Sequence, residues 1–341
     1  MPLLGRDTSE LRALLQKEGA PAYRGGQLAE WLYRRRALTF DEMSNLPGAL
    51  RTRLQDKYEV GRSRLVTACH SQDGTVKLLL ELRDGARIET VGLPYADRFS
   101  GCLSTQVGCP VGCVFCATGQ GGFTRNLTAG EIVDQALAIQ AEGSDRRLDH
   151  VIFMGMGEPL LNYEAVMKAA RLLNNEVGVA MRHITLSTGG IVPGILRLAE
   201  EKSQLGLAVS LHAPADNLRR RIVPNAKWPV AEVIAACHQY IRLTGRRVTF
   251  EYCLLGGVND DLEQARQLAA LLHGLNCHVN LIPYNSSGTA RFREPSLESI
   301  RAFRRALANL GIQVTQRLRR GRDIEAACGQ LRQRIDKETR L

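Results

Sequence analysis

Cys109-Pro-Val-Gly-Cys113-Val-Phe-Cys116 is the stretch around which the rest of this sequence is interpreted. Its three cysteines lie within eight residues, so three thiolates can converge on one inorganic centre. A structural zinc ion normally takes four protein ligands, and an iron–sulfur cluster normally takes four cysteines. Three cysteines would leave one iron of a cluster open, which suits a cluster that binds a substrate. The alternative to a metal centre is that the three cysteines are packed in the core, and the flanking Gly108 and Gly112 argue against it.

Composition indicates a globular protein that works in a reducing compartment. The chain has 341 residues, of which 44% are hydrophobic, so one large domain and a small one are expected. The amino terminus shows no apolar signal region, and we find no apolar run long enough to span a bilayer. Nine cysteines in such a chain indicate the cytosol, where thiols serve metals or catalysis. We therefore expect a cytoplasmic protein with no membrane partner.

The charge of the chain suits a polyanionic partner such as RNA. The formal net charge is +10, although a solvated basic surface would explain this value equally well. Two arginine clusters favour RNA binding over a solvated basic surface. They are Tyr33-Arg34-Arg35-Arg36 near the start, and Arg317, Arg319, Arg320 and Arg322 near the end.

Hydrophobic periodicity divides the chain into three parts. Residues 1–60 carry leucines at helical spacing and predict a small helical domain. Residues 61–97 change to the period of β-strands on either side of Asp84-Gly85, which predicts a β-hairpin linker. Residues 98–341 alternate between strands and amphipathic helices and would form the main domain.

This alternation predicts an α/β fold with a parallel sheet and right-handed crossovers. The capping box Thr128-Ala-Gly-Glu131 marks the start of one helix, and Asp260 with Glu263 marks the start of another. Six or seven strand–helix units indicate a partial barrel of the (βα)6 type, with chemistry at the carboxyl ends of its strands. The candidate strands are residues 102–107, 149–154, 183–188, 206–212, 248–254, 278–283 and 312–317.

Polar residues follow four of these strands. Strand 149–154 leads into Gly155-Met-Gly-Glu-Pro-Leu160, whose glycines permit close approach of a ligand and whose Glu158 can take an ammonium group. His212 alone would more often be a structural histidine. Four polar strand ends beside three cysteines favour a cofactor pocket instead. The other three ends are Ser187-Thr-Gly-Gly190, Ser210-Leu-His-Ala-Pro214 and Pro283-Tyr-Asn285.

Several motifs in the chain match those of a known family. Besides the CxxxCxxC stretch, they are Cys102-Leu-Ser-Thr-Gln-Val-Gly-Cys109, Gly122-Phe-Thr-Arg-Asn-Leu127, Gly155-Met-Gly-Glu-Pro-Leu160, Ser210-Leu-His-Ala-Pro214 and Asp323-Ile-Glu-Ala-Ala-Cys-Gly-Gln-Leu331. CxxxCxxC resembles the signature of the radical S-adenosylmethionine (SAM) enzymes. The full set resembles the RlmN/Cfr family of RNA adenine methyltransferases, from the helical start to Cys328.

The resemblance implies a radical SAM barrel with two kinds of cofactor. One [4Fe-4S] cluster per chain would be bound by Cys109, Cys113 and Cys116. The amino acid end of SAM would chelate the open iron, and two SAM molecules would be used per turnover. The residues that would contact SAM are Gly157, Glu158, Ser187, Ser210, Leu211, His212 and Asn285.

The resemblance also implies a reaction that passes through a methylated cysteine. Cys328 would take a methyl group from SAM as a nucleophilic thiolate and carry it to C2 of an adenosine. Cys102 would then attack the Cys328 sulfur, release the methylated base and leave a disulfide. Glu89 would be the proton acceptor, although without the family it would be interpreted as a solvent-facing strand glutamate.

The same resemblance implies the partners. The substrates would be 23S rRNA, at an adenosine of the peptidyl-transferase centre, and tRNA, at the adenosine next to the anticodon. The helical domain of residues 1–60 would serve RNA binding, the linker of residues 61–97 would carry Glu89, and a C-terminal loop would carry Cys328. An electron donor such as flavodoxin or ferredoxin would supply the cluster, and the protein would act as a monomer.

Three alternatives remain open from the sequence. The first is methylation of C8 of the same rRNA adenosine, as in the Cfr branch, because the machinery is shared. The second is a different radical enzyme, either protein-activating or sulfur-inserting, which would predict neither Cys102 nor Cys328. The third is a zinc-bound RNA-binding module without enzymatic activity, which would predict colourless protein.

Overall fold

A ten-stranded mixed sheet organises the computed structural model, which describes residues 1–143, 146–285 and 292–331. Neighbouring strands pair antiparallel from β1 to β4 and parallel from β4 to β12. In spatial order the strands are β1 (Arg64–His70), β2 (Val76–Glu81), β3 (Arg87–Pro94), β4 (Phe99–Cys102), β7 (His150–Phe153), β8 (Ile184–Thr188), β9 (Gly206–Ser210), β10 (Val248–Leu254), β11 (Cys277–Pro283) and β12 (Val314–Gln316).

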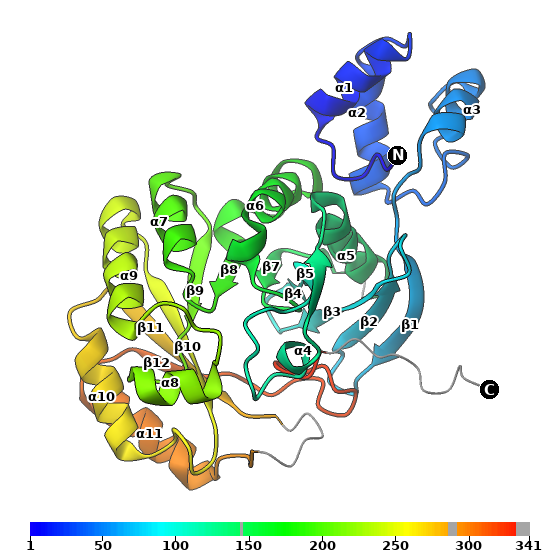
Figure 1. The fold of residues 1–341 in the computed structure, drawn as a ribbon. Coiled ribbons are helices and arrows are strands. Elements are labelled where there is room, and N and C mark those ends of the chain that lie inside the picture. Colours follow the sequence, from blue (N-terminus) through cyan, green and yellow to red (C-terminus); the bar gives the residue numbers. More distant parts are fainter. Residues whose placement is uncertain (144–145, 286–291, 332–341) are drawn as a thin grey trace.

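Helices connect consecutive parallel strands and cover the outer face of the curved sheet (Figure 1). This arrangement confirms the predicted partial (βα)6 barrel, because each crossover returns the chain to the next parallel strand. The connecting helices are α5 (Ala129–Glu142), α6 (Tyr163–Leu172), α7 (Val192–Glu200), α9 (Val230–Thr244), α10 (Leu262–Leu272) and α11 (Leu297–Asn309). Shorter helical segments are α4 (Ala117–Gln120), η2 (Pro159–Asn162), η3 (Leu173–Val177), η4 (Met181–His183) and α8 (Asp216–Ile222).

Two local predictions need correction. The strand predicted over 102–107 is split, because β4 ends at Cys102 and β5 (Gln106–Gly108) pairs with β6 (Phe123–Asn126) in a separate small sheet. The cause is Ser104, which leaves the ladder and donates its backbone N–H to Gln135 and its hydroxyl to the Glu89 carbonyl. Helix α10 begins after Asp261, whose carboxylate accepts from the Gln264 N–H, rather than after Asp260.

The predicted hairpin exists and belongs to the main sheet. β2 and β3 pair around Asp84-Gly85, and β3 pairs in turn with β4, where Val91 lies opposite Cys102. The residues of the predicted linker therefore hydrogen-bond directly with the strands of the main domain. The division into residues 1–60, 61–97 and 98–341 stays a prediction.

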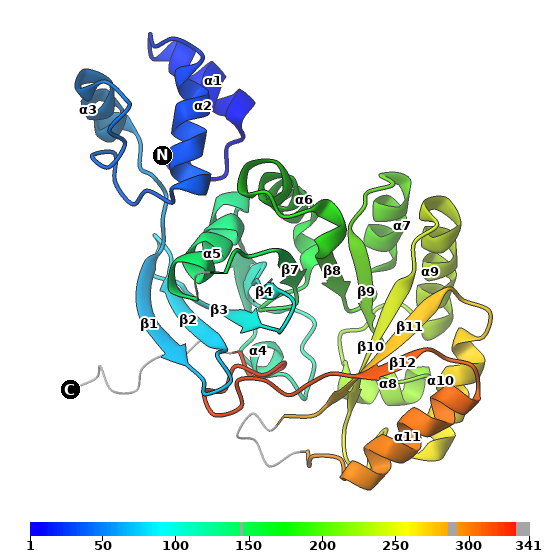
Figure 2. The same ribbon diagram turned by 180° about the vertical axis from the view of Figure 1, so that it is seen from behind.

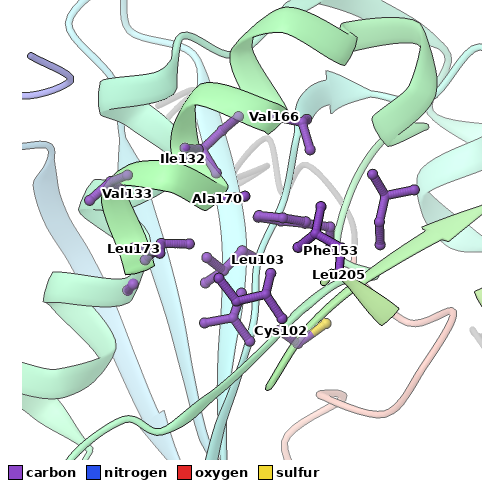
Figure 3. Close-up of a cluster of buried hydrophobic side chains, with 14 of the residues drawn as sticks. Cys102, Leu103, Ile132, Val133, Phe153, Val166, Ala170, Leu173 and Leu205 are labelled. Carbon is purple, nitrogen blue, oxygen red and sulfur yellow. The ribbon is translucent and has the colours of Figure 1, made fainter. Parts of the chain in front are cut away.

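The core lies between the sheet and its helices. Parallel strands are buried on both faces, so they read as almost continuous apolar runs, as in Val248–Leu254 of β10. The capping box predicted at Thr128 and Glu131 is present and starts α5. Figure 3 shows Leu103 and Phe153 against Ile132, Val133, Val166 and Ala170 of α5 and α6, with Cys102 at the edge of this cluster.

The amino-terminal helices pack beside α5 and α6, beyond one end of the sheet (Figures 1 and 2). The backbone N–H and the hydroxyl of Thr8 both donate to the Glu176 carboxylate, at 2.9 and 2.8 Å. Lys168 pairs with Glu10 at 2.7 Å. The elements of this unit are α1 (Thr8–Lys17), α2 (Arg24–Ala29), η1 (Glu30–Arg34) and α3 (Gly48–Lys57). Within the described ranges, no helix is long and apolar enough to cross a membrane.

Residues 317–331, here called the C-terminal loop, run from β12 back towards β1 and β2 and pass α4 (Figure 2). The turn between β1 and β2 holds the first half of this loop, because Asp73 accepts from the Gly321 N–H at 3.0 Å and the Ser71 hydroxyl donates to Asp323 at 2.6 Å. The α4 region holds the second half, because the Ala117 N–H donates to the Gly329 carbonyl at 2.8 Å. The loop therefore joins the two sides of the open barrel.

Candidate active site

One cavity collects most of the predicted site residues. Its wall is formed by the carboxyl ends of several parallel strands, the residues 109–116 (the cysteine loop) and the C-terminal loop. The predicted residues on this wall are Cys102, Cys109, Cys113, Cys116, Gly157, Glu158, Ser187, Ser210, His212, Asn285 and Cys328.

The backbone conformation just before the cysteine loop requires a glycine. Gly108 has φ +78°, and a Cβ there would lie 2.0 Å from the Gly122 carbonyl oxygen. The Cys109 N–H donates to that same carbonyl at 2.7 Å, which fixes the first cysteine against the β5–β6 sheet. All three cysteines of the loop are half-buried and face the cavity.

The donor set of the cysteine loop fits an iron–sulfur cluster better than one ion. Among the described residues, no three His, Cys, Asp or Glu side chains form a group that could hold a metal ion. A cluster spreads its cysteine ligands over different irons. Burial raises the pKa of the Cys109 thiol to about 12 and raises that of the Cys113 thiol well above its ordinary value, so these two thiols hold their protons until a metal centre replaces them.

Glu158 is a buried carboxylate that is tied to the backbone on two sides. Its Oε1 accepts from the Leu160 N–H at 3.0 Å and its Oε2 from the Gly189 N–H at 2.6 Å. Burial raises its pKa to about 7, and the two backbone donors counteract part of that rise. Gly157 precedes it at φ +108°, and a Cβ there would meet Gln106 at 2.7 Å. This carboxylate can accept further hydrogen bonds from a ligand amino group.

Small polar groups line the neighbouring strand ends. The Ser187 and Ser210 hydroxyls lie 3.5 Å apart, at the ends of β8 and β9. Asn285 is buried, and its Oδ1 has no hydrogen-bond partner among the described residues, so it is available to a ligand. Leu211 does not line the cavity: its side chain is buried in the core and its N–H donates to the Glu251 carbonyl at 3.1 Å.

His212 is a neutral imidazole in this site. Its Nδ1 accepts from the Cys253 N–H at 3.0 Å, so the ring proton resides on Nε2. Burial, and after it the nearby Arg219, lower its pKa to about 3. Phe115 of the cysteine loop meets the ring edge-on, with the centroids 4.9 Å apart. His212 therefore serves packing and hydrogen bonding rather than proton transfer at neutral pH.

Cys102 and Cys328 lie on the same cavity wall although they come from distant parts of the chain. Burial raises the pKa of both thiols, to about 12 for Cys102, while the positive charge of Arg317 lowers both. Both are free thiols, so the disulfide that the resemblance implies is not present. The reduced form is the one that a methyl-accepting cysteine needs at the start of a cycle.

Glu89 lies near the cavity but not on its wall. It is 2% exposed, so the interpretation as a solvent-facing glutamate is wrong. It lies opposite Leu79 in the sheet, and its Oε1 is 3.4 Å from the Lys77 ammonium. Val91, two residues further along the same strand, does line the cavity.

Arg317 is a site residue that sequence reasoning assigned to an RNA-binding cluster. Its guanidinium instead faces the cavity, where Nη1 lies 3.1 Å from the Met154 sulfur. Arg319 and Arg322 are also not free cations, because both pair with Glu294 at 2.5 and 2.8 Å. The signal that points to Arg317 is its position directly after β12, at the edge of the sheet that carries the other site residues.

Two family models match this chain. Residues 1–60 match the ribosomal RNA large subunit methyltransferase N-terminal domain, and residues 103–269 match the radical SAM superfamily.

Curated and solved relatives extend the match to almost the whole chain. The chain is 52% identical to the probable dual-specificity RNA methyltransferase RlmN of Thermosynechococcus vestitus, with 98% of each chain covered. It is 49% identical to the protein of the same description from Gloeobacter violaceus, over 98% of this chain and 95% of that one. The crystal structure of a radical SAM methyltransferase from Sphaerobacter thermophilus superposes with a TM-score of 0.95 at 49% identity, covering 98% of this chain and 100% of that chain.

Proposed function

Because this chain belongs to the RlmN family of dual-specificity radical SAM RNA methyltransferases, we propose that it methylates C2 of adenosine in two kinds of RNA. One target is an adenosine in the peptidyl-transferase centre of 23S rRNA, and the other is the adenosine next to the tRNA anticodon. The observation that carries the proposal is the shared cavity of Cys102, Cys328 and the cysteine loop. A radical enzyme of another class would not require the thiols of Cys102 and Cys328.

The cofactors of the enzyme are a [4Fe-4S] cluster and SAM. In our proposal Cys109, Cys113 and Cys116 hold the cluster. When bound, the cofactors supply a methyl group and a radical route to an adenine ring carbon, which is too electron-poor to attack a methyl sulfonium directly. The residues proposed to hold SAM are Gly157, Glu158, Ser187, Ser210, Leu211, His212 and Asn285, with Leu211 contributing through its backbone.

The two cavity thiols have different proposed roles. The Cys328 thiolate accepts the methyl group, and the nearby Arg317 cation favours that thiolate. After transfer to the base, the Cys102 thiolate attacks the Cys328 sulfur. The bond between that sulfur and the methylated base breaks as the S–S bond forms. The disulfide must then be reduced by an external thiol or reductase before the next cycle.

Glu89 is proposed to accept the ring proton. Its position supports this role, because it lies on the same face of β3 as Val91, a residue of the cavity wall. Its carboxylate is buried, and its Oε1 lies 3.4 Å from the Lys77 ammonium.

RNA binding is proposed for the amino-terminal helical unit. Arginine side chains stack on aromatic rings there, with Arg24 4.9 Å from the Tyr23 ring centroid and Arg35 4.6 Å from that of Trp31. Such pairs combine phosphate attraction with a surface on which bases can stack. We further propose that the protein acts as a monomer and that flavodoxin or ferredoxin reduces the cluster.

Nucleoside mass spectrometry after anaerobic reconstitution tests the proposal. We expect 2-methyladenosine in a 23S rRNA fragment and in tRNA, and loss of the same nucleoside from RNA of a deletion strain. Finding only 8-methyladenosine would replace the C2 assignment with C8 methylation. RNA binding by a colourless protein that contains zinc and forms no methylated product would replace the enzyme with a binding module.

A further inference from the structure

Lys77 is a buried lysine that touches two parts of the proposed machinery. It lies in the middle of β2, and the residue is only 5% exposed. Burying an ammonium group is costly unless the charge is paired and hydrogen-bonded. Here Nζ lies 3.4 Å from Glu89 Oε1 and donates to the Glu325 carbonyl at 3.2 Å.

The strand register explains why Lys77 meets Glu89. Lys77 lies opposite Val91, and Leu79 lies opposite Glu89, so Lys77 and Glu89 are diagonal neighbours on one face of the sheet. Val91 on that face lines the cavity. Lys77 therefore projects on the inner side of the sheet, next to the proposed proton acceptor.

The other contact ties Lys77 to the C-terminal loop. Glu325 lies three residues before Cys328 and has a left-handed backbone with φ 52°. Ala326 and Ala327, which follow it, are buried and line the cavity. The Glu325 carbonyl therefore marks the point where the loop turns inwards and brings Cys328 to the cavity wall.

We propose that Lys77 is a positioning residue that holds the Cys328 segment of the C-terminal loop against the proton acceptor Glu89. This role rests on the proposed function of those two residues. Lys77 touches no reacting atom in this proposal. It fixes one loop position in which Cys328 faces the cysteine loop, and it fixes the Glu89 carboxylate on the same inner face.

The test measures loop position without RNA or turnover. Full-length, cluster-loaded protein is treated with trypsin, which cleaves after the arginines at 319, 320 and 322, and separately with iodoacetamide, which labels Cys328. For Lys77→Met we expect the rate of trypsin cleavage in the loop and the rate of Cys328 labelling to rise about tenfold. This factor corresponds to the loss of one hydrogen bond from a charged donor. Lys77→Arg, which keeps a cationic donor, should restore most of the protection. Lys168→Met is the matched control, because it removes a lysine paired at 2.7 Å with Glu10, away from the loop.

Specific loss of loop position differs from general loss of stability. If Lys77 only stabilised the fold, its replacement would raise trypsin cleavage throughout the chain, in proportion to the drop in unfolding temperature. If Lys77→Met does not fold, Lys77→Gln is measured instead, since its side chain carries no charge and is one atom shorter, so that it cannot hold Glu89 and the Glu325 carbonyl together. Unchanged loop cleavage and labelling, or a rise shared by all cleavage sites, would overturn the inference. Failure of the proposed function would appear separately, as wild-type protein that never carries a methyl group on Cys328.

Discussion

If Glu158 holds SAM as proposed, we predict that SAM binding depends on pH near neutrality. Burial raises its pKa to about 7, and its two oxygens already accept from the Gly189 and Leu160 N–H groups. Only the ionised carboxylate keeps spare lone pairs on both oxygens for a ligand amino group. At pH 8 about nine-tenths of the protein is ionised at this site, and at pH 6 about one-tenth. The affinity for the cofactor should therefore fall about tenfold, or about 1.4 kcal/mol, between pH 8 and pH 6.

Calorimetry with S-adenosylhomocysteine measures this effect, because that molecule keeps the amino acid end and cannot methylate Cys328. The cluster-loaded protein is titrated anaerobically at pH 6, 7 and 8. Glu158→Gln should bind weakly at every pH, because its amide NH2 would face one of the two backbone donors. Glu201→Gln is the control, since Glu201 accepts from the Tyr163 hydroxyl away from the cavity. Equal affinity at pH 6 and pH 8, or a pH dependence that survives in Glu158→Gln, would refute the assignment.

The same pKa shift predicts that, without cofactors, the difference in unfolding free energy between wild type and Glu158→Gln changes with pH. The folded state holds the Glu158 proton more tightly than the unfolded state, whose pKa is near 4.5. This contribution is fully present below pH 4.5 and is lost as pH rises through about 7, a total of about 3 kcal/mol. His212 acts in the opposite direction, because its pKa is lowered to about 3. Urea unfolding should therefore be compared between wild type and Glu158→Gln, so that the His212 contribution cancels.

Three further predictions concern the cluster, the RNA and the two cavity thiols. Cys113→Ala should lose the absorption near 400 nm and should release no 5′-deoxyadenosine from SAM, and retained release would remove Cys113 from the cluster. Affinity for a 23S rRNA fragment should fall steeply across a salt series because cation–phosphate contacts release counterions, whereas a flat response would exclude electrostatics. Cys102→Ala should trap labelled RNA covalently on Cys328 in a denaturing gel, and Cys328→Ala should leave the RNA unmodified. Equal crosslinking in both variants, or full turnover in either, would show that the proposed roles of Cys102 and Cys328 are wrong.

Local patterns were sufficient for the framework of the protein. The capping box at Thr128 and Glu131, the hairpin around Asp84-Gly85 and the alternation of strands and helices all depend on residues close in sequence. The spacing of the cysteine loop likewise predicts a metal centre without any knowledge of the fold. The polar strand ends were expected to meet because carboxyl ends of parallel strands share one edge, and the cavity collects them.

The orientation and partners of individual side chains came only from the tertiary structure. Arg317 sits in an arginine-rich stretch, yet it faces the cavity because β12 ends directly beside it. Glu89 alternates with its neighbours like an exposed strand residue, yet it is buried beside Lys77. These outcomes depend on packing between segments that are far apart in the chain, which no local period encodes. Charge and periodicity were thus determined by sequence, whereas burial and pairing of those charges were decided by which distant surfaces came together.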